Sequence, residues 1–319
     1  MYTQETQFPE IMENEITTFW QQRKEGYIKG VSDKRLFWVS LISPNHTKAV
    51  VVINGRVESA WKYQEIFYDL FQQGFDVYSF DHRGQGLSER LVEDQQIGYV
   101  DDFSDYINDM ALLVDSFKLN RYQQRFILAH SMGGAIATRY IQNHPSHNFD
   151  AIALSAPMYG VTMPWYQKPI ARYLTPVISV LFNRPIYISK NRSYFAKPFD
   201  INPLTSSLPR YTWFRELYER HPKLKLGGPS ARWVWQGLVA AEQCIRNTHR
   251  INIPLLLLQG TADKIVSNQA QHKFINQLNK TNSENELVII EGSKHEILFE
   301  SDKYRNLALE NTMRFFSAI

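Results

Sequence analysis

Apolar and polar residues follow two periods along the chain, and these predict strands and helices in turn. Segments with apolar residues at helical spacing lie between short apolar runs that predict buried strands. The predicted strands are Leu36 to Ile42, Ala49 to Ile53, Phe75 to Phe80, Phe126 to Ala129, Ala151 to Ser155, Leu255 to Leu258 and Leu287 to Ile290. The predicted helices are Trp61 to Gln73, Phe103 to Phe117, Gly134 to Asn143, Gln269 to Leu278 and Lys303 to Phe316. This alternation predicts an α/β fold with a mostly parallel sheet and helices on both faces.

The alternation stops between Ala156 and Ile251, where about ninety residues separate two predicted strands. An ordinary connection is much shorter. Helical spacing recurs at Ala171 to Phe182, Arg210 to His221 and Pro229 to Asn247, where Pro229 suits a first helical turn. We therefore predict a core formed by residues 1–156 and 251–319, with a helical cap, residues 157–250, inserted before the strand Leu255 to Leu258.

The N-terminal segment is polar and lacks the apolar core of a secretion signal. We expect Ile16 to Tyr27 to form a short amphipathic helix that packs Ile16, Phe19 and Trp20 on the core. No segment approaches the roughly 18 consecutive apolar residues of a membrane span, so any membrane contact is expected to be peripheral.

A serine lies at the junction between a predicted strand and a predicted helix, in the run from Leu128 to Gly134. This arrangement predicts a nucleophile elbow, with Ser131 on a strained turn and small residues two positions away on either side. Gly133 meets that need, and Ala129 replaces the more usual glycine with the smallest possible side chain. The alternative is an ordinary serine N-cap.

An acid and a histidine follow in the order that completes such a site. Asp263 comes just after the apolar run that breaks at Gly260, and His295 follows the next apolar run. A serine hydroxyl needs a neutral imidazole to take its proton, and the imidazole needs a carboxylate to fix its tautomer. We therefore predict Ser131, His295 and Asp263 as a catalytic triad, and we expect His82, His130 and His272 to be structural or surface residues.

Two further turns belong to the predicted site. The strand before Asn54 ends in a glycine turn, and we predict that the backbone N–H groups of Arg56 and Met132 form an oxyanion hole. The turn from Phe80 to Ser88 is glycine-rich, and we expect Asp81 and Arg83 to tie it near the elbow by hydrogen bonds.

Charge is distributed unevenly along the chain. The predicted cap carries 14 Lys and Arg against four acidic residues, a balance of +10, whereas the rest of the chain carries −7. Aromatic side chains such as Trp165, Tyr166, Trp213 and Trp233 lie among these basic residues. A basic, aromatic lid suits an acyl chain with a phosphate head group, or a membrane surface rich in anionic lipid. The alternative is a solvated basic face over an ordinary aromatic core.

Cysteine usage is minimal, because Cys244 is the only cysteine. An intramolecular disulfide, a cysteine framework and a zinc cluster are therefore excluded, and a reducing compartment is allowed.

The chain resembles the bacterial lysophospholipases of the monoacylglycerol lipase-like α/β-hydrolases. The segments that carry the resemblance are Asn54 to Ser59, Phe80 to Ser88, Ala129 to Gly134, Leu154 to Met158, Gly227 to Trp233 and Lys294 to Glu300. The resemblance implies an α/β-hydrolase fold whose triad is Ser131, Asp263 and His295. It further implies hydrolysis of one fatty acyl ester of a glycerophospholipid, without a cofactor, at the cytoplasmic face of a membrane.

Several alternatives remain open from the sequence. A monoacylglycerol lipase would use the same site with a neutral head group, and peptide, thioester or small-ester hydrolysis is compatible with the fold. A different hypothesis is that the protein is not an enzyme but a catalytically inactive lipid-binding protein of this fold. We expect a lysophospholipid or another monoacyl lipid as substrate, peripheral contact with an anionic membrane, a cytoplasmic location at the inner membrane and no nucleic-acid partner.

Overall fold

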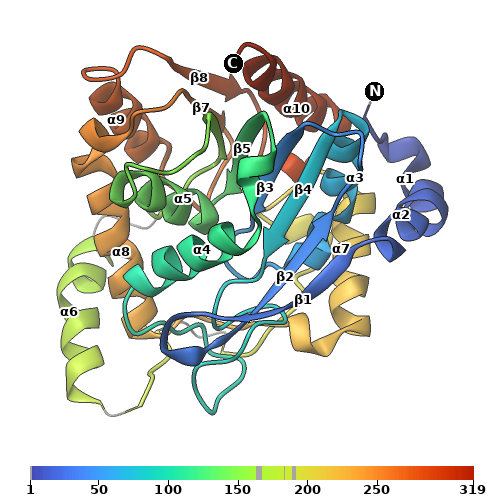
Figure 1. The fold of residues 1–319 in the computed structure, drawn as a ribbon. Coiled ribbons are helices and arrows are strands. Elements are labelled where there is room, and N and C mark those ends of the chain that lie inside the picture. Colours follow the sequence, from blue (N-terminus) through green and yellow to red (C-terminus); the bar gives the residue numbers. More distant parts are fainter. Residues whose placement is uncertain (1, 163–166, 183, 189–191) are drawn as a thin grey trace.

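One eight-stranded sheet organises the molecule (Figure 1). The structure is a computed structural model that describes residues 2–162, 167–182, 184–188 and 192–319, and the side chains of residues 167–170 are also outside the description. The spatial strand order is β1-β2-β4-β3-β5-β6-β7-β8. The strands are β1 Lys24–Lys29, β2 Arg35–Leu41, β3 Lys48–Ile53, β4 Phe75–Phe80, β5 Gln124–His130, β6 Ala151–Ser155, β7 Leu255–Gly260 and β8 Asn285–Ile290. All pairs from β4 to β8 are parallel, and only β1 and β2 run antiparallel to their neighbours.

Helices cover both faces of the sheet, as the alternating pattern predicts. In Figure 1, α4 and α5 lie in front of the sheet, and α3 and α10 lie behind it. The helices of the core that follow β3 are α3 Gln64–Gln72, α4 Ser104–Ser116, α5 Met132–Asn143, α9 Asn268–Leu278 and α10 Asp302–Ser317. Phe316 of α10 stacks on Phe126 of β5 with ring centroids 4.3 Å apart, within a core made of buried residues from nearly every strand. The predicted fold and the seven predicted strands are confirmed.

The N-terminal segment differs from the prediction in its second half. Helical structure runs through α1 Phe8–Ile11, a π-helical turn Met12–Ile16 and α2 Thr17–Gln21, and it ends before β1. A helix from Ile16 to Tyr27 is therefore wrong. Gly26 weakens any helix there, and as a strand residue it lies against Trp38, whose ring a Cβ at Gly26 would approach to 3.3 Å. Ile16, Phe19 and Trp20 are buried, as predicted.

The described residues of the insertion between β6 and β7, by which we mean residues 157–250, include three α-helices. They are α6 Gln167–Leu181, α7 Leu208–Arg220 and α8 Ala231–Arg246. Ser230 caps α8 by accepting a hydrogen bond from the backbone N–H of Trp233 at 3.1 Å, so Pro229 precedes this helix instead of opening it. Trp165 and Tyr166 lie outside the described residues.

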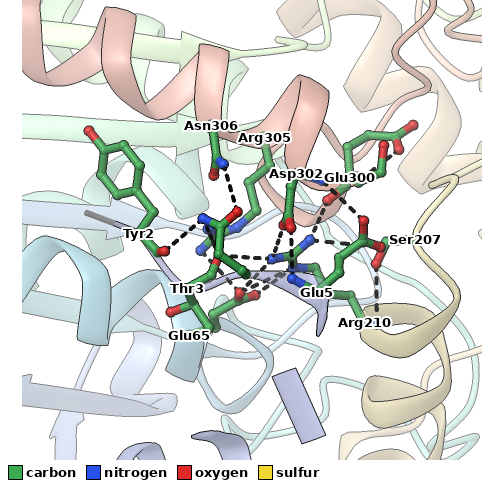
Figure 2. Close-up of polar contacts among 12 residues, drawn as sticks. Tyr2, Thr3, Glu5, Glu65, Ser207, Arg210, Glu300, Asp302, Arg305 and Asn306 are labelled. Carbon is green, nitrogen blue, oxygen red and sulfur yellow. Dashed lines mark hydrogen bonds and ion pairs between the residues drawn. The ribbon is translucent and has the colours of Figure 1, made fainter. Parts of the chain in front are cut away.

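A buried ion network joins the insertion to the core (Figure 2). Arg210 of α7 donates to Glu65 of α3 at 2.9 Å and to Asp302 of α10 at 2.8 Å. Beside it, Arg305 donates to Asp69 at 2.6 Å, and the backbone oxygen of Thr3 accepts from Arg210. Burial opposes the charge on Arg210, but the two carboxylates raise its pKa above the ordinary value. The network therefore fixes α7 against α3, α10 and the N-terminal segment.

Candidate active site

Ser131 lies on a sharp turn between β5 and α5. Its φ of 52° and ψ of −117° place a non-glycine residue in a strained conformation, as expected for a nucleophile elbow. A Cβ at Gly133 would come within 2.4 Å of the carbonyl oxygen of Asn54, so only glycine lets α5 pass this close to the end of β3. Ala129 is fully buried in β5, and its methyl group is accommodated.

His295 joins the serine to the predicted acid by two hydrogen bonds. Its Nε2 lies 3.0 Å from Oγ of Ser131, and its Nδ1 lies 2.7 Å from Oδ2 of Asp263. The side chains of His295 and Asp263 are both buried. A Cβ at Gly260 would come within 2.5 Å of the carbonyl oxygen of Ser293, so the glycine lets the loop that carries His295 pack against the end of β7.

The carboxylate of Asp263 is held ionised by its surroundings. Burial opposes ionisation, but hydrogen bonds from His295 and from the backbone N–H groups of Ile265 and Val266 keep the pKa of Asp263 below its ordinary value. An ionised Asp263 can only accept, so Nδ1 of His295 carries the proton. Nε2 is then free to accept the hydroxyl proton of Ser131.

The other histidines near the serine have structural contacts. Burial lowers the pKa of both His82 and His130 to about 4, so both are neutral at neutral pH. His130 lies 3.0 Å from the carbonyl oxygen of Ser155 through Nδ1, and His82 lies 3.0 Å from that of Asn54 through Nε2. His272 lies on α9. Among the histidines that the structure describes, the geometry therefore brings only His295 within hydrogen-bond distance of the Ser131 hydroxyl.

The loop after β3 lies directly beside the serine. A Cβ at Gly55 would come within 3.2 Å of Cβ of Ser131, and Arg56 follows in the same loop, while Met132 opens α5 on the other side. Oε2 of Glu58 accepts hydrogen bonds from the N–H of Gly55 and from the hydroxyl of Tyr63, both at 2.6 Å. The loop that carries one predicted oxyanion donor is thus held by a buried carboxylate.

The turn from Phe80 to Ser88 is tied in two directions. Asp81 accepts from the hydroxyl of Ser59 at 2.8 Å and from the N–H of Ala60 and Leu87 at 2.7 Å, and burial raises its pKa to about 6. Asp81 therefore ties the turn to the loop beside the elbow, as predicted. Arg83 instead donates to carboxylates of α4, Asp105 and Asp109, so its expected contact near the elbow is wrong.

A buried ion cluster lies next to His295, and the sequence analysis did not predict it. Nζ of Lys62 lies 2.7 Å from a carboxylate oxygen of Glu58 and 2.7 Å from one of Glu296. Burial would raise the pKa of Glu58, but Lys62 holds it below its ordinary value. The i,i+4 spacing of Glu58 and Lys62 is a signal for a pair, although it cannot distinguish a buried pair from an exposed one.

A cavity of about 440 Å³ opens above Ser131 and His295. Its floor consists of the loops after β3, β5, β7 and β8, which supply Gly55, Ser131, Val266 and His295. Its roof consists of insertion residues, among them Tyr194, Phe214, Arg215, Tyr218 and Trp233. Across the described part of the chain, no group of three or more His, Cys, Asp or Glu side chains is placed to hold a metal ion.

Residues 44–302 match the model of the Hydrolase_4 family, whose description is "Serine aminopeptidase, S33". The chain belongs to this family. Lysophospholipase L2 of Escherichia coli strain K12 is 37% identical over 99% of this chain and 94% of its own length. A probable lysophospholipase L2 of Haemophilus influenzae is 33% identical over 95% of each chain.

Solved structures support the fold of this Hydrolase_4 member. A soluble variant of monoglyceride lipase from Saccharomyces cerevisiae, in complex with a substrate analog, superposes with a TM-score of 0.72 at 20% identity, over 93% of this chain and 96% of that one. At that identity the likeness shows the α/β-hydrolase fold alone. The resemblance stated from the sequence motifs is therefore confirmed for family and fold.

Proposed function

We propose that the protein is a serine ester hydrolase that cleaves the fatty acyl ester of lysophospholipids. The observation that carries the proposal is the hydrogen-bond relay from Ser131 through His295 to Asp263, at 3.0 and 2.7 Å, within a cavity of about 440 Å³. The near full-length similarity to lysophospholipase L2 supports the ester and the lipid class.

The reaction follows from the relay. Nε2 of His295 takes the hydroxyl proton as Oγ of Ser131 attacks the ester carbonyl, and the oxyanion that forms is stabilised by the N–H groups of Arg56 and Met132. The imidazolium then gives its proton to the departing glycerol oxygen, which leaves an acyl group on Ser131. Water, deprotonated by the same imidazole, attacks the acyl-enzyme and releases the fatty acid.

The insertion serves as a cap over this site, residues 157–250, on a core of residues 1–156 and 251–319. Exposed apolar side chains on and beside α6 support peripheral contact with a membrane: Tyr173, Val180 and Leu181 are 69%, 71% and 72% exposed. Exposed Arg184 and Arg192 nearby suit anionic lipid on a cytoplasmic leaflet. Among the described residues, no helix combines the length and apolar character needed to cross a membrane.

One experiment ranks the candidate substrates. Turnover of a lysophospholipid, a monoacylglycerol with the same acyl chain and a diacyl phospholipid is compared under one detergent condition, and we expect the highest kcat/KM for the lysophospholipid. A preference for the monoacylglycerol would make the protein a monoacylglycerol lipase. A fluorophosphonate that labels the wild type but not Ser131→Ala would exclude an inactive lipid-binding protein, and an unlabelled wild type would overturn the mechanism.

A further inference from the structure

Two arginines that line the cavity have no acidic partner. Arg56 lies on the floor and Arg215 in the roof, and no carboxylate of the described residues lies within 4.0 Å of either guanidinium. The residues outside the description contain no Asp or Glu. Lys62, which lines the same cavity, is by contrast held between Glu58 and Glu296. The cavity lining therefore contains two guanidinium groups that no carboxylate of the described residues pairs directly.

Arg56 is packed in a rigid setting. Its Nη2 donates to the carbonyl oxygen of Gly227 at 2.7 Å, and its guanidinium lies over the ring of Trp233 at 4.9 Å. A Cβ at Gly98 would come within 2.5 Å of the same Nη2, so the group lies against bare backbone. Its Nε is buried without a hydrogen-bond partner among the described residues. Burial lowers the pKa of Arg56 to about 10, which leaves it protonated at neutral pH.

Among the residues that the structure describes, Arg215 has only neutral partners. It donates to the hydroxyl groups of Tyr194 at 2.9 Å and Tyr211 at 3.0 Å, and its guanidinium lies over the ring of Phe214 at 4.5 Å. Its Nε, like that of Arg56, is buried and has no partner in the described part of the chain. The aromatic rings fix the direction of the group and leave its charge uncompensated.

The two arginines are linked through one segment. Gly227, which accepts from Arg56, donates its N–H to the backbone oxygen of Gln96 at 2.7 Å. The side-chain oxygen of Gln96 in turn accepts from the N–H of Tyr194, the residue that orients Arg215. Floor and roof are thus connected by a chain of hydrogen bonds that runs between the partners of the two arginines.

We propose that Arg56 and Arg215 bind the phosphodiester of the lysophospholipid head group while the ester lies at Ser131. This inference rests on the proposed function. A buried charge is costly without a counter-charge, and an incoming anion would supply one. Guanidinium groups match phosphate oxygens in geometry and charge. The phosphate lies only one glycerol unit from the ester, so its site must share the cavity with the nucleophile, as these two side chains do.

The test measures substrate preference in Arg215→Gln and, independently, in Arg56→Gln. The readout is the ratio of kcat/KM for lysophosphatidylcholine to kcat/KM for the monoacylglycerol with the same acyl chain. We expect the ratio to fall about 30-fold in each variant, equivalent to about 2 kcal/mol for a lost charge partner. The matched control is Arg220→Gln on the same helix, where Arg220 is exposed and paired with Glu216, and its ratio should equal that of the wild type. An unchanged ratio in both Arg215→Gln and Arg56→Gln overturns the inference.

A second measurement tests the site without lysophospholipid turnover. Glycerophosphocholine, inorganic phosphate and glycerol are compared as inhibitors of hydrolysis of a short neutral ester. We expect glycerophosphocholine to inhibit the wild type best, with an inhibition constant at least tenfold higher for Arg215→Gln. Inorganic phosphate that inhibits equally well would overturn the head-group assignment. If the wild type does not cleave lysophosphatidylcholine, the proposed function fails; if it does and the ratios do not change, only the present inference fails.

Discussion

The floor of the cavity and the insertion above it are held in place by different interactions. On the floor, a strained Ser131, close glycine contacts and hydrogen bonds of 2.6 to 3.0 Å fix each polar group. In the insertion, α7 is fixed by the ion network of Arg210. By contrast, α6 packs on α8 (Figure 1) and has exposed apolar residues. Polar interactions therefore fix the floor and α7, whereas α6 depends mainly on packing against α8. We expect the consequences of substitution to decrease in the same order.

Substitution of the relay residues tests the floor and should have the largest effect. Ser131→Ala and His295→Ala each remove the group that attacks or the group that moves the proton, so kcat should fall by about four to six powers of ten. Turnover is measured on lysophospholipid and on a short neutral ester, with thermal unfolding as the control for the fold. Residual activity within tenfold of the wild type would remove the relay from the mechanism.

Asp263→Asn should lower kcat somewhat less than Ser131→Ala and His295→Ala do. An amide at this position can donate to Nδ1 of His295, which favours the tautomer whose Nε2 carries the proton and cannot accept from Ser131. We expect a loss on the order of ten-thousandfold in kcat on both substrates. A nearly silent variant would mean that another group orients His295. The loss should be equal on the two substrates, because Asp263 acts on the proton transfer at His295 and not on the head group.

Substitution of Arg210, which fixes α7, should change the free energy of unfolding more than it changes turnover. Arg210→Met removes the guanidinium that pairs with Asp302 and leaves the buried Glu65 with Arg305 as its cation at 3.5 Å, so we expect the free energy of unfolding to fall by about 3–5 kcal/mol. Urea unfolding measures the change, and Arg220→Met on the exposed side of the same helix should stay within about 0.5 kcal/mol of the wild type. If the two variants lose equal stability, α7 is not fixed by the network.

The same comparison shows what the sequence could and could not predict. The seven strands, the main helices and the serine, acid and histidine at strand ends follow from periodicity and from turn residues, because these depend on local chemistry. Helix boundaries at Ser230 and the strand around Gly26 depend on contacts with distant residues. Charge is the clearest case, since a balance of +10 counts each basic residue of the insertion alike. Arg210 proves to be buried among acids and Arg215 to line the cavity, whereas Arg184 is exposed.

Peripheral membrane contact concerns the outermost part of the insertion and should give the smallest effect. Val180→Ser and Leu181→Ser remove exposed apolar area from α6, and Arg184→Gln removes a charge worth about 1 kcal/mol at an anionic surface. We expect each to weaken association with vesicles that contain anionic lipid by about fivefold, the equivalent of about 1 kcal/mol. Turnover of a soluble neutral ester should not change, because α6 does not line the cavity in the described residues.

Leu307→Ser provides the matched control, because Leu307 is an exposed apolar residue of α10, which lies outside the insertion. This variant should bind vesicles like the wild type. Raising the salt concentration should weaken association of the wild type with the vesicles. The screening length of surface charge is about 8 Å at physiological ionic strength and becomes shorter as salt is added. If association does not depend on salt and the α6 variants bind as well as Leu307→Ser, the exposed face of α6 is not a membrane contact. The substrate would then have to reach Ser131 from solution.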